Sequence, residues 1–389
     1  MRVVFVVRSV PPVIDGVGDY TWQLTRFLRS EGIDAHVVTS TNQDMARGLG
    51  QEWVHPVVPR WTGRAVVEAI AATPVPRPDW CIFQYVPQMY GRRGICWAAS
   101  GVARALRPTL KCRVATTFHE FASAGGWDPK DAVLATVMRW QTRRLLEGSD
   151  LAITTCSRYA QHLKALALRA LPVVTIPVGA NIEPARLPPD KIVALRRHYS
   201  LNGSKVFGMI GQVSPARNFS TAIRVLERAK DQGLKSALLL IGRVEPSNPG
   251  LYAKLRCLAR ELGVDSQVLV TGELSAEDVS AHLRLVDVFL FPQCDGISTR
   301  NTTVMTALAH GLRIISYAPE SGNFDGYRVP EGALVPLGDE ESFIRAAVAS
   351  LRGMGDNSEG SKPNSQYFEE HFSWSRIGKR YIDALTTVG

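Results

Sequence analysis

The stretch from Val286 to Ser316 constrains the fold of this chain more than any other. It opens with the apolar run Val288–Phe291 and closes with Leu312–Ser316, and both runs have the length and the β-branched or aromatic content of buried strands. Between them, apolar residues recur at helical spacing, and Gly311 occupies the position at which helices commonly end. The stretch therefore predicts a strand, a polar loop, a short helix and a second strand.

The same alternation of strands and helices continues along almost the whole chain. Further strands are expected at residues 2–8, 35–39, 80–86, 113–118, 151–155, 173–177, 206–210, 237–241, 267–270 and 333–336. Strands separated by helices pair in parallel, so the sequence predicts an α/β protein with two Rossmann-like, doubly wound parallel-sheet domains facing across a cleft.

The domain boundaries follow from breaks in this alternation. We place the N-terminal domain at residues 1–180 and the C-terminal domain at residues 202–373. Prolines and a glycine interrupt the pattern between them, so residues 181–201 are interpreted as a linker. The terminal helix, at residues 374–389, is expected to pack back on the first domain.

The amino-acid composition limits the classes of binding partner that this chain is expected to have. The chain of 389 residues carries a formal charge of +9, which favours anionic partners such as phosphorylated substrates or an acidic membrane surface. Nucleic acid is not expected, because the arginines are scattered and no nucleic-acid-binding signature is present. Six cysteines without a C-x-x-C pair indicate reduced core thiols. Without a secretory signal or a long apolar run, we expect a cytoplasmic protein with at most peripheral contact at the inner membrane face.

The loop at residues 295–303, before the helix of the opening stretch, is crowded with hydroxyls, one amide and one guanidinium. A helix N-terminus leaves backbone N–H groups without partners and favours anions, so this loop is a candidate phosphate site. The alternative is ordinary helix capping, for which Ser, Thr and Asn are the usual residues.

Two glycines, Gly16 and Gly18, flank Val17 between the first strand and an amphipathic helix expected from Tyr20 onward. Glycine lets a backbone approach a ligand closely. The spacing lacks the third glycine of a dinucleotide fingerprint, and no acidic residue ends the next strand, so a nicotinamide cofactor is disfavoured.

His119 directly follows a predicted strand, with Glu120 beside it, while Gln84 and Tyr85 lie at the end of a neighbouring predicted strand. A histidine in such a position can act as an acid or base, or donate a hydrogen bond to a substrate hydroxyl. Local packing of the imidazole is the alternative.

In their order along the chain, these motifs resemble the GT-B glycosyltransferases, and within them the family-4-like group (group 1) of retaining enzymes that use nucleotide sugars. The resemblance covers nearly the whole chain. It implies transfer of a sugar from a nucleoside-diphosphate sugar to a hydroxyl of a glycan, a lipid-linked sugar or a small molecule. The nucleotide sugar would be a co-substrate, and neither a cofactor nor a bound metal is implied.

The resemblance also assigns site residues. Residues 211–218 correspond to the family segment G-R-x-x-x-x-K-G, whose two cations hold the diphosphate; here Gln212 replaces the Arg and Arg217 the Lys. The catalytic residues implied are His119, Arg217 and Arg300. Donor binding is implied for Gly16, Val17, Gly18, Gln212, Arg217, Asn218, Gly272, Glu273, Ser298, Thr299, Arg300, Asn301, Thr302 and Thr303. Asp19, Tyr20, Gln84, Tyr85 and Glu120 are expected on the acceptor side.

One departure from the family pattern is large. The two glutamates that normally contact the donor sugar and the ribose are replaced by Ser298 and Thr306. The run around Arg300 resembles a subgroup in which hydroxyls hold the phosphate end and the guanidinium offsets charge on the leaving nucleotide. Two alternatives stay open: a non-catalytic nucleotide-sugar-binding partner or regulatory subunit, and a sugar-nucleotide epimerase, for which Glu120 is the one carboxylate beside His119.

Overall fold

The computed structural model describes residues 1–13, 15–41, 50–75, 77–120, 129–211, 214–242, 249–319, 322, 324–352 and 363–388. The chain divides into two compact units. The N-terminal unit consists of Met1–Gly179 together with Trp374–Gly389, and the C-terminal unit consists of Ala180–Ser373.

Seven parallel strands form the sheet of the N-terminal unit, in the order β3-β2-β1-β4-β5-β6-β7. The strands are β1 (Arg2–Val6), β2 (Asp34–Ser40), β3 (Val54–Val58), β4 (Trp80–Tyr85), β5 (Arg113–Phe118), β6 (Leu151–Thr154) and β7 (Val173–Thr175). Helices cover both faces of a parallel sheet, so the inner strands are buried on both sides and read as continuous apolar runs. The strand order reverses between β1 and β4.

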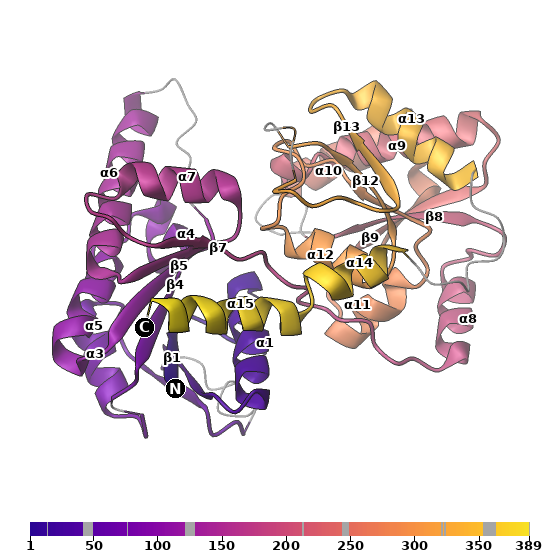
Figure 1. Cartoon of the computed structure of the whole chain (residues 1–389). Helices are drawn as coiled ribbons and strands as arrows, with labels where there is room; N and C mark the ends of the chain where they lie inside the picture. Colours follow the sequence, from indigo (N-terminus) through magenta and orange to yellow (C-terminus); the bar gives the residue numbers. More distant parts are fainter. Residues whose placement is uncertain are drawn as a thin grey trace. The chain divides into compact units, whose positions relative to one another are not determined.

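Two layers of helices enclose this sheet (Figure 1). The helices are α1 (Gly16–Ser30), α3 (Gly63–Ala71), α4 (Pro87–Tyr90), α5 (Val102–Leu110), α6 (Pro129–Gly148), α7 (Ser157–Leu166) and α15 (Trp374–Thr387), with short 3₁₀ turns η1 (Arg92–Gly94) and η2 (Ala99–Gly101). Helices α3, α5, α6 and α7 bury their apolar residues in one core with side chains of β1, β4 and β5. Helices α1 and α15 pack together on the other side.

The last helix of the chain is therefore part of the N-terminal unit. The Tyr20 hydroxyl of α1 donates to the Tyr381 hydroxyl of α15 over 3.1 Å, and that hydroxyl lies 3.1 Å from the Thr117 hydroxyl of β5. All three side chains are buried. A Cβ at Gly378 would overlap the ring of Phe27, so α15 needs glycine at the point where it meets α1.

The C-terminal unit repeats this arrangement with six parallel strands in the order β10-β9-β8-β11-β12-β13. The strands are β8 (Lys205–Ile210), β9 (Ser236–Ile241), β10 (Val268–Val270), β11 (Val288–Phe291), β12 (Arg313–Tyr317) and β13 (Gly332–Val335). Here the order reverses between β8 and β11, as in the Rossmann fold.

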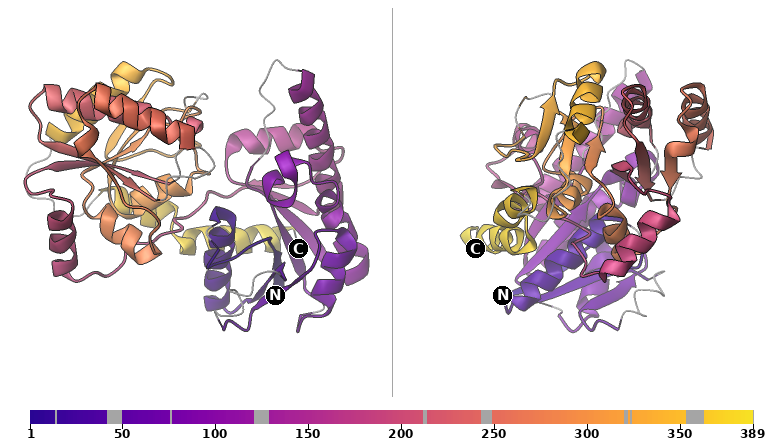
Figure 2. Two further views of the ribbon diagram at one scale, coloured as in Figure 1. Left: turned by 180° about the vertical axis from the view of Figure 1, so that it is seen from behind. Right: turned by 90° about the vertical axis from the view of Figure 1, so that its right-hand side faces the viewer.

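Helices again lie on both faces of the sheet (Figure 2). They are α8 (Pro189–His198), α9 (Phe219–Asp231), α10 (Pro249–Glu261), α11 (Ala276–Leu283), α12 (Thr302–Ala309), α13 (Glu340–Arg352) and α14 (Pro363–His371), with 3₁₀ turns η3 (Pro215–Arg217) and η4 (Asp265–Gln267). Helices α9, α10 and α13 share one apolar core. Helices α12 and α14 pack on each other, as do α11 and α8. The predicted fold class, with two Rossmann-like sheets, is confirmed.

Several local features differ from the sequence prediction or were not predicted. Residues 181–201, interpreted as a linker, contain α8, and neither α14 nor β3 was predicted. Helix α1 begins at Gly16, four residues before the predicted start, because the Asp15 carboxylate caps it by accepting from the Val17 N–H over 3.3 Å. Four cysteines are buried as expected, but Cys257 and Cys294 are exposed. Within the described residues, no helix is both long and apolar enough to cross a membrane.

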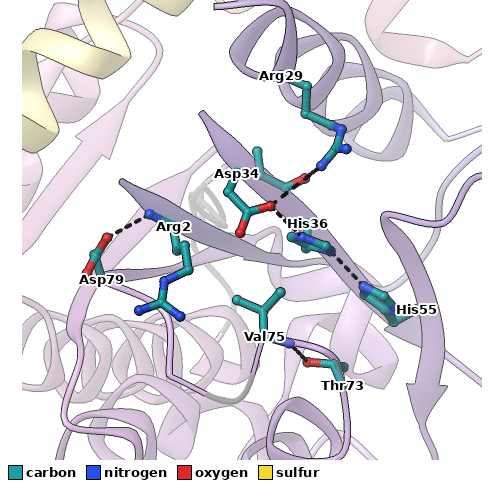
Figure 3. Close-up of polar contacts among 9 residues, drawn as sticks. Arg2, Arg29, Asp34, His36, His55, Thr73, Val75 and Asp79 are labelled. Carbon is teal, nitrogen blue, oxygen red and sulfur yellow. Dashed lines mark hydrogen bonds and ion pairs between the residues drawn. The ribbon is translucent and has the colours of Figure 1, made fainter. Parts of the chain in front are cut away.

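A histidine pair joins β2 to the edge strand β3 (Figure 3). Nδ1 of His36 lies 2.9 Å from Nε2 of His55, and the rings stack with centroids 5.1 Å apart. The Asp34 carboxylate lies 2.9 Å from the other nitrogen of His36 and 3.9 Å from Arg29. Burial and the neighbouring His36 together lower the pKa of His55 to about 4.

This pair predicts a pH dependence of stability. A histidine in the unfolded chain titrates near pH 6.5, about 2.5 units above folded His55, so between these values only the unfolded chain binds the proton. The free energy of unfolding should therefore fall as the pH drops from 6.5 towards 4. Because His55 is half-exposed, we expect its share to be about 1 kcal/mol.

Urea unfolding at pH 7.5 and pH 5 checks this prediction. The substitution His55→Gln should reduce the difference in stability between the two pH values, whereas His162→Gln, at an exposed position on α7, should leave it unchanged. An equal pH dependence in wild type and His55→Gln would contradict the assignment.

Candidate functional site

In open α/β sheets, ligands bind beyond the carboxyl ends of the strands, where the strand order reverses. Each unit has one such point, between β1 and β4 in the N-terminal unit and between β8 and β11 in the C-terminal unit. Most of the predicted site residues follow these strands or the adjacent ones, so each sheet gathers a separate set of them.

The glycines after β1 form the first turn of α1 rather than a loop. Gly18 is buried, and a Cβ there would lie 2.6 Å from the carbonyl oxygen of Ser9. Its lack of a side chain is therefore required for packing within the chain, and the expected approach of a ligand to this backbone stays a prediction. Gly16 is exposed, and the Val17 N–H is used by Asp15.

Asp19 lies on the same turn, and its carboxyl is unusual. Burial, with the neighbouring charge of Asp15, raises the pKa of Asp19 to about 7. At neutral pH this carboxyl is divided between its protonated and ionised forms, so it can both give and take a proton.

Both tyrosines that were predicted on the acceptor side point into the protein interior. Tyr20 is 1% exposed, with its hydroxyl on Tyr381. Tyr85 is fully buried, and its hydroxyl lies 3.5 Å from the sulfur of Cys96. Consecutive strand residues point to opposite faces of the sheet, so Tyr85 points away from the face on which Gln84 and α1 lie. The structure therefore leaves neither hydroxyl at the surface of the N-terminal unit.

His119 and Gln84 are brought together, as their strand-end positions predicted. The backbone N–H of His119 donates to the Tyr85 carbonyl over 3.0 Å and so extends the pairing of β4 with β5. Its Nε2 lies 2.6 Å from Oε1 of Gln84, and the Tyr20 ring packs edge-on at 4.9 Å. Burial lowers the pKa of His119 to about 3, so the imidazole is neutral at physiological pH. Glu120, which follows, is exposed.

In the C-terminal unit, Arg217 ends the turn η3 at the reversal point. Its guanidinium donates to the Ile210 carbonyl at the end of β8 and packs over Gly211, where a Cβ would lie 2.8 Å from Nη1. A small hollow between Arg217 and residues Phe289–Gln293 marks the space between β8 and β11. Burial lowers the pKa of Arg217. Among the described residues no carboxylate forms an ion pair with the Arg217 guanidinium.

The other predicted donor residues of this unit are less distinctive. Asn218 adopts the left-handed conformation (φ 45°), and its side-chain oxygen accepts from the Ser220 hydroxyl over 2.8 Å. Gly272 also has positive φ, 76°, in the turn after β10, and the neighbouring Glu273 is exposed. Gln212 lies outside the described residues.

The polar loop before α12 is closed on itself. The Asn301 side-chain oxygen accepts from the Ser298 N–H over 2.7 Å, and the Ser298 hydroxyl accepts from the Arg300 N–H over 3.4 Å. The Arg300 guanidinium forms an ion pair with Asp295. The predicted role of Arg300, to offset charge on the leaving nucleotide, stays a prediction, and the structure adds that Asp295 balances this charge inside the loop.

Thr299 is also unavailable to a ligand, because it is fully buried and its hydroxyl donates to Asp325 over 2.5 Å. Thr302 and Thr303, in contrast, are partly exposed at the first turn of α12, where backbone N–H groups have no partner within the helix. They are the members of the predicted hydroxyl set that keep an anion-binding position.

Three residues with clear local roles were missed by sequence reasoning. Asp15 caps α1, and Asp directly before a helix was a readable signal. Asp295 neutralises Arg300 from within the same loop. Asp325 holds Thr299 from 26 positions along the chain, and no local pattern predicts such a pairing.

Two sheets in Rossmann order, each with polar groups at its reversal point, define a class of two-domain α/β protein of the GT-B type. Comparison with known families agrees. Residues 15–179 match the family of glycosyl transferase 4-like domains, and residues 204–352 match the glycosyl transferases of group 1.

Individual relatives point the same way. A GDP-mannose-dependent alpha-(1-6)-phosphatidylinositol monomannoside mannosyltransferase of Mycobacterium tuberculosis is 25% identical over 302 residues, which cover 75% of this chain and 72% of that enzyme. A 2-deoxystreptamine glucosyltransferase of Streptomyces kanamyceticus is 24% identical over 162 residues, 41% of this chain and 40% of that enzyme.

Solved structures share the fold. The Anabaena protein HepE, crystallised with UDP and glucose, superposes with a TM-score of 0.73 at 14% identity over 100% of both chains. The sucrose-phosphate synthase of Thermosynechococcus elongatus superposes with a TM-score of 0.71 at 16% identity over 100% of this chain and 99% of that one. This chain belongs to the group 1, family-4-like glycosyltransferases of the GT-B fold.

The packing of Gly18 yields a prediction that separates structure from binding. Gly18→Ala places a methyl group against the Ser9 backbone and should lower the free energy of unfolding by about 1–3 kcal/mol. Gly16→Ala, at the exposed start of the same helix, should change it by less than about 0.5 kcal/mol. Urea denaturation of both variants measures this, and a Gly18→Ala protein as stable as wild type would contradict the packing role.

Proposed function

We propose that this glycosyltransferase moves a hexose from a nucleoside-diphosphate sugar to a hydroxyl of a glycan, a lipid-linked sugar or a small molecule. The observation that carries the proposal is Arg217, a half-buried guanidinium that no carboxylate of the described residues neutralises, at the strand-order reversal of the C-terminal unit. A hexose is favoured because the two curated relatives named above are a mannosyltransferase and a glucosyltransferase.

The reaction places its main electrostatic demand on the leaving group. The bond between the anomeric carbon and the diphosphate oxygen breaks, the acceptor oxygen bonds to that carbon and loses its proton, and the nucleoside diphosphate departs with the negative charge. Fixed donors aimed at this charge lower the barrier. In our proposal, Arg217 and the backbone N–H groups at Thr302 and Thr303 are these donors.

The N-terminal unit would then serve the acceptor and the transferred sugar. Asp19 has a pKa near 7 and so can take the proton that the acceptor hydroxyl loses. His119, neutral and nearly buried, is suited to holding a sugar hydroxyl rather than to transferring a proton at neutral pH. The substitution Asp19→Asn tests the first role, since an unchanged turnover would remove Asp19 from it.

The family match does not favour the alternatives of an epimerase or a non-catalytic partner. We further propose that the anomeric configuration is retained and that no metal ion is needed, both by analogy with the family. Proton NMR of the new glycosidic bond and assays with excess EDTA test these two points. An inverted product or a loss of turnover in EDTA would refute them separately.

We also propose peripheral contact with anionic membranes, and an exposed aromatic surface on the N-terminal unit supports it. Trp97 is 55% exposed and Trp140 of α6 is 39% exposed, with ring centroids 4.9 Å apart. Ile95, beside them in sequence, is 37% exposed. Tryptophan rings with one wet and one apolar side are typical of the membrane interface.

The protein holds this surface in place, and arginines lie on it or near it in the sequence. The buried Gln141 accepts from the Cys96 N–H over 2.6 Å and donates to the Gly94 carbonyl over 3.0 Å, which fixes this segment on α6. The Arg144 guanidinium lies 4.8 Å above the Trp140 ring. The other arginines nearby in sequence, all exposed, are Arg92, Arg93, Arg139 and Arg143. Such a surface is complementary to acidic headgroups.

The donor-site proposal predicts a specific loss of diphosphate affinity. Arg217→Ala removes a charge-assisted hydrogen bond, so the Kd for UDP or GDP, whichever the protein binds, should rise by about tenfold to hundredfold. Arg217→Lys keeps the positive charge but lacks the planar, forked guanidinium, so its Kd should lie between those of wild type and Arg217→Ala. Isothermal titration with each nucleoside diphosphate and monophosphate measures the effect.

Arg228→Ala is the matched control, because this arginine of α9 is exposed and pairs with Glu341 over 2.8 Å. It should bind the nucleotide like wild type. A protein that binds neither diphosphate, or an Arg217→Ala variant of unchanged affinity, would remove Arg217 from a donor site.

The membrane proposal predicts selective binding to acidic vesicles. Cosedimentation with vesicles of phosphatidylglycerol and phosphatidylcholine should exceed that with phosphatidylcholine alone, and salt should weaken it. The double substitution Trp97→Ser and Trp140→Ser should reduce binding about tenfold or more. Leu168→Ser, at a position 72% exposed elsewhere in the unit, should not. Equal binding by both variants would contradict the assignment.

A further inference from the structure

Gln84 is a buried polar residue whose position the fold alone does not explain. It occupies the next-to-last position of β4, is fully buried and faces the side of the sheet covered by α1 and α15. Apolar residues fill the other inward-facing positions of this strand, Ile82 among them. An amide in such a place costs free energy unless its groups are hydrogen-bonded, so a buried amide calls for an explanation.

One half of the Gln84 amide has a partner, and the other half has none within the described residues. Its oxygen lies 2.6 Å from Nε2 of His119, whereas its nitrogen is buried without an acceptor. The bond to His119 is therefore the polar contact that holds the Gln84 head group. A side chain kept for stability alone would be expected to use both of its ends, as Gln141 does with Cys96 and Gly94.

This contact determines where the imidazole carries its proton. An amide oxygen can only accept, so Nε2 of His119 must be the donor. The ring is neutral at physiological pH and has one ring proton, so Nδ1 carries a lone pair that can accept a hydrogen bond. The sequence suggested that His119 donates a hydrogen bond to a substrate hydroxyl. The ring proton is already donated to Gln84, so towards a substrate the ring can only accept.

We propose that Gln84 is a positioning residue that holds His119 as the Nε2–H tautomer, so that Nδ1 accepts a hydrogen bond from a hydroxyl of the transferred sugar. The second half of this inference rests on the proposed function, whereas the first half concerns the free protein alone. A sugar hydroxyl oriented by Nδ1 turns its lone pairs away from the ring, which fixes its direction without any proton transfer.

The tautomer is measured directly by NMR on protein labelled with ¹⁵N-histidine. The two-bond and three-bond couplings between the carbon-bound ring protons and the ring nitrogens distinguish the Nε2–H tautomer from the Nδ1–H tautomer. The substitution His119→Asn identifies the resonances that belong to this ring. We expect a single Nε2–H tautomer at pH 7 with a slowly exchanging ring proton. A predominant Nδ1–H signal would overturn the inference.

Variants of Gln84 test the cause. Gln84→Met keeps the shape but removes the acceptor, so the protected ring proton should be lost, while Gln84→Glu retains an oxygen acceptor and should keep it. Gln141→Met removes a buried amide of the same unit and should leave the His119 resonances unchanged. A protected Nε2 proton that persists in Gln84→Met would show that Gln84 does not hold it.

Kinetics then connect the tautomer to the reaction. In Gln84→Met, kcat for sugar transfer should fall about tenfold, the size of one neutral hydrogen bond, with the Kd for the nucleoside diphosphate unchanged. Unchanged kcat would overturn the role at the sugar. If no sugar transfer is found for the wild type while the NMR result holds, the proposed function fails and the tautomer assignment stands.

Discussion

Parallel pairing across the point of strand-order reversal is the constraint from which the candidate sites follow. In the C-terminal unit, β8 pairs with β9 on one side and with β11 on the other. The chain must therefore leave β8 and β11 in opposite directions over the sheet, which opens a space between their ends. Arg217 enters that space because η3 is tied to the exit of β11 by the Cys294 N–H, which donates to the Ala216 carbonyl over 3.0 Å. The position of this guanidinium is thus a property of the sheet more than of its own loop.

Two arginines of the C-terminal unit, Arg217 and Arg300, differ in how their charges are balanced. Arg300 and Asp295 form an ion pair within a loop whose backbone is also bonded internally. Such a loop is close to neutral, and it leads into the start of α12 without adding net charge. Arg217, with no carboxylate partner among the described residues, keeps its charge for a ligand. In the proposed donor site, which lacks the family's two glutamates, a cation and backbone N–H groups rather than carboxylates would bind the diphosphate.

The sequence predicted the strands well, since residues buried on both faces of a parallel sheet form apolar runs that need no partner to be recognised. The alternation of helices and strands, and the position of His119 at the end of a strand, were predicted from the same pattern. What could not be predicted depends on distant partners. Thr299 reads as a capping residue until Asp325 is seen beside it, and Tyr20 reads as a surface residue until α15 covers it. Helix α8 was missed because its prolines resemble a linker, although a proline at the start of a helix is compatible with it.

The contribution of α15 to the N-terminal unit bears on how His119 is supported. The Tyr20 ring packs against both His119 and Trp374, and its hydroxyl meets Tyr381. Tyr381 in turn reaches Thr117, two residues before His119 on β5. The last helix of the chain thus helps to cover the face on which Gln84 and His119 meet, and burial of the imidazole lowers the pKa of His119. The surroundings of His119 therefore include residues beyond position 373, which join the N-terminal unit only after the chain has passed through the whole C-terminal unit.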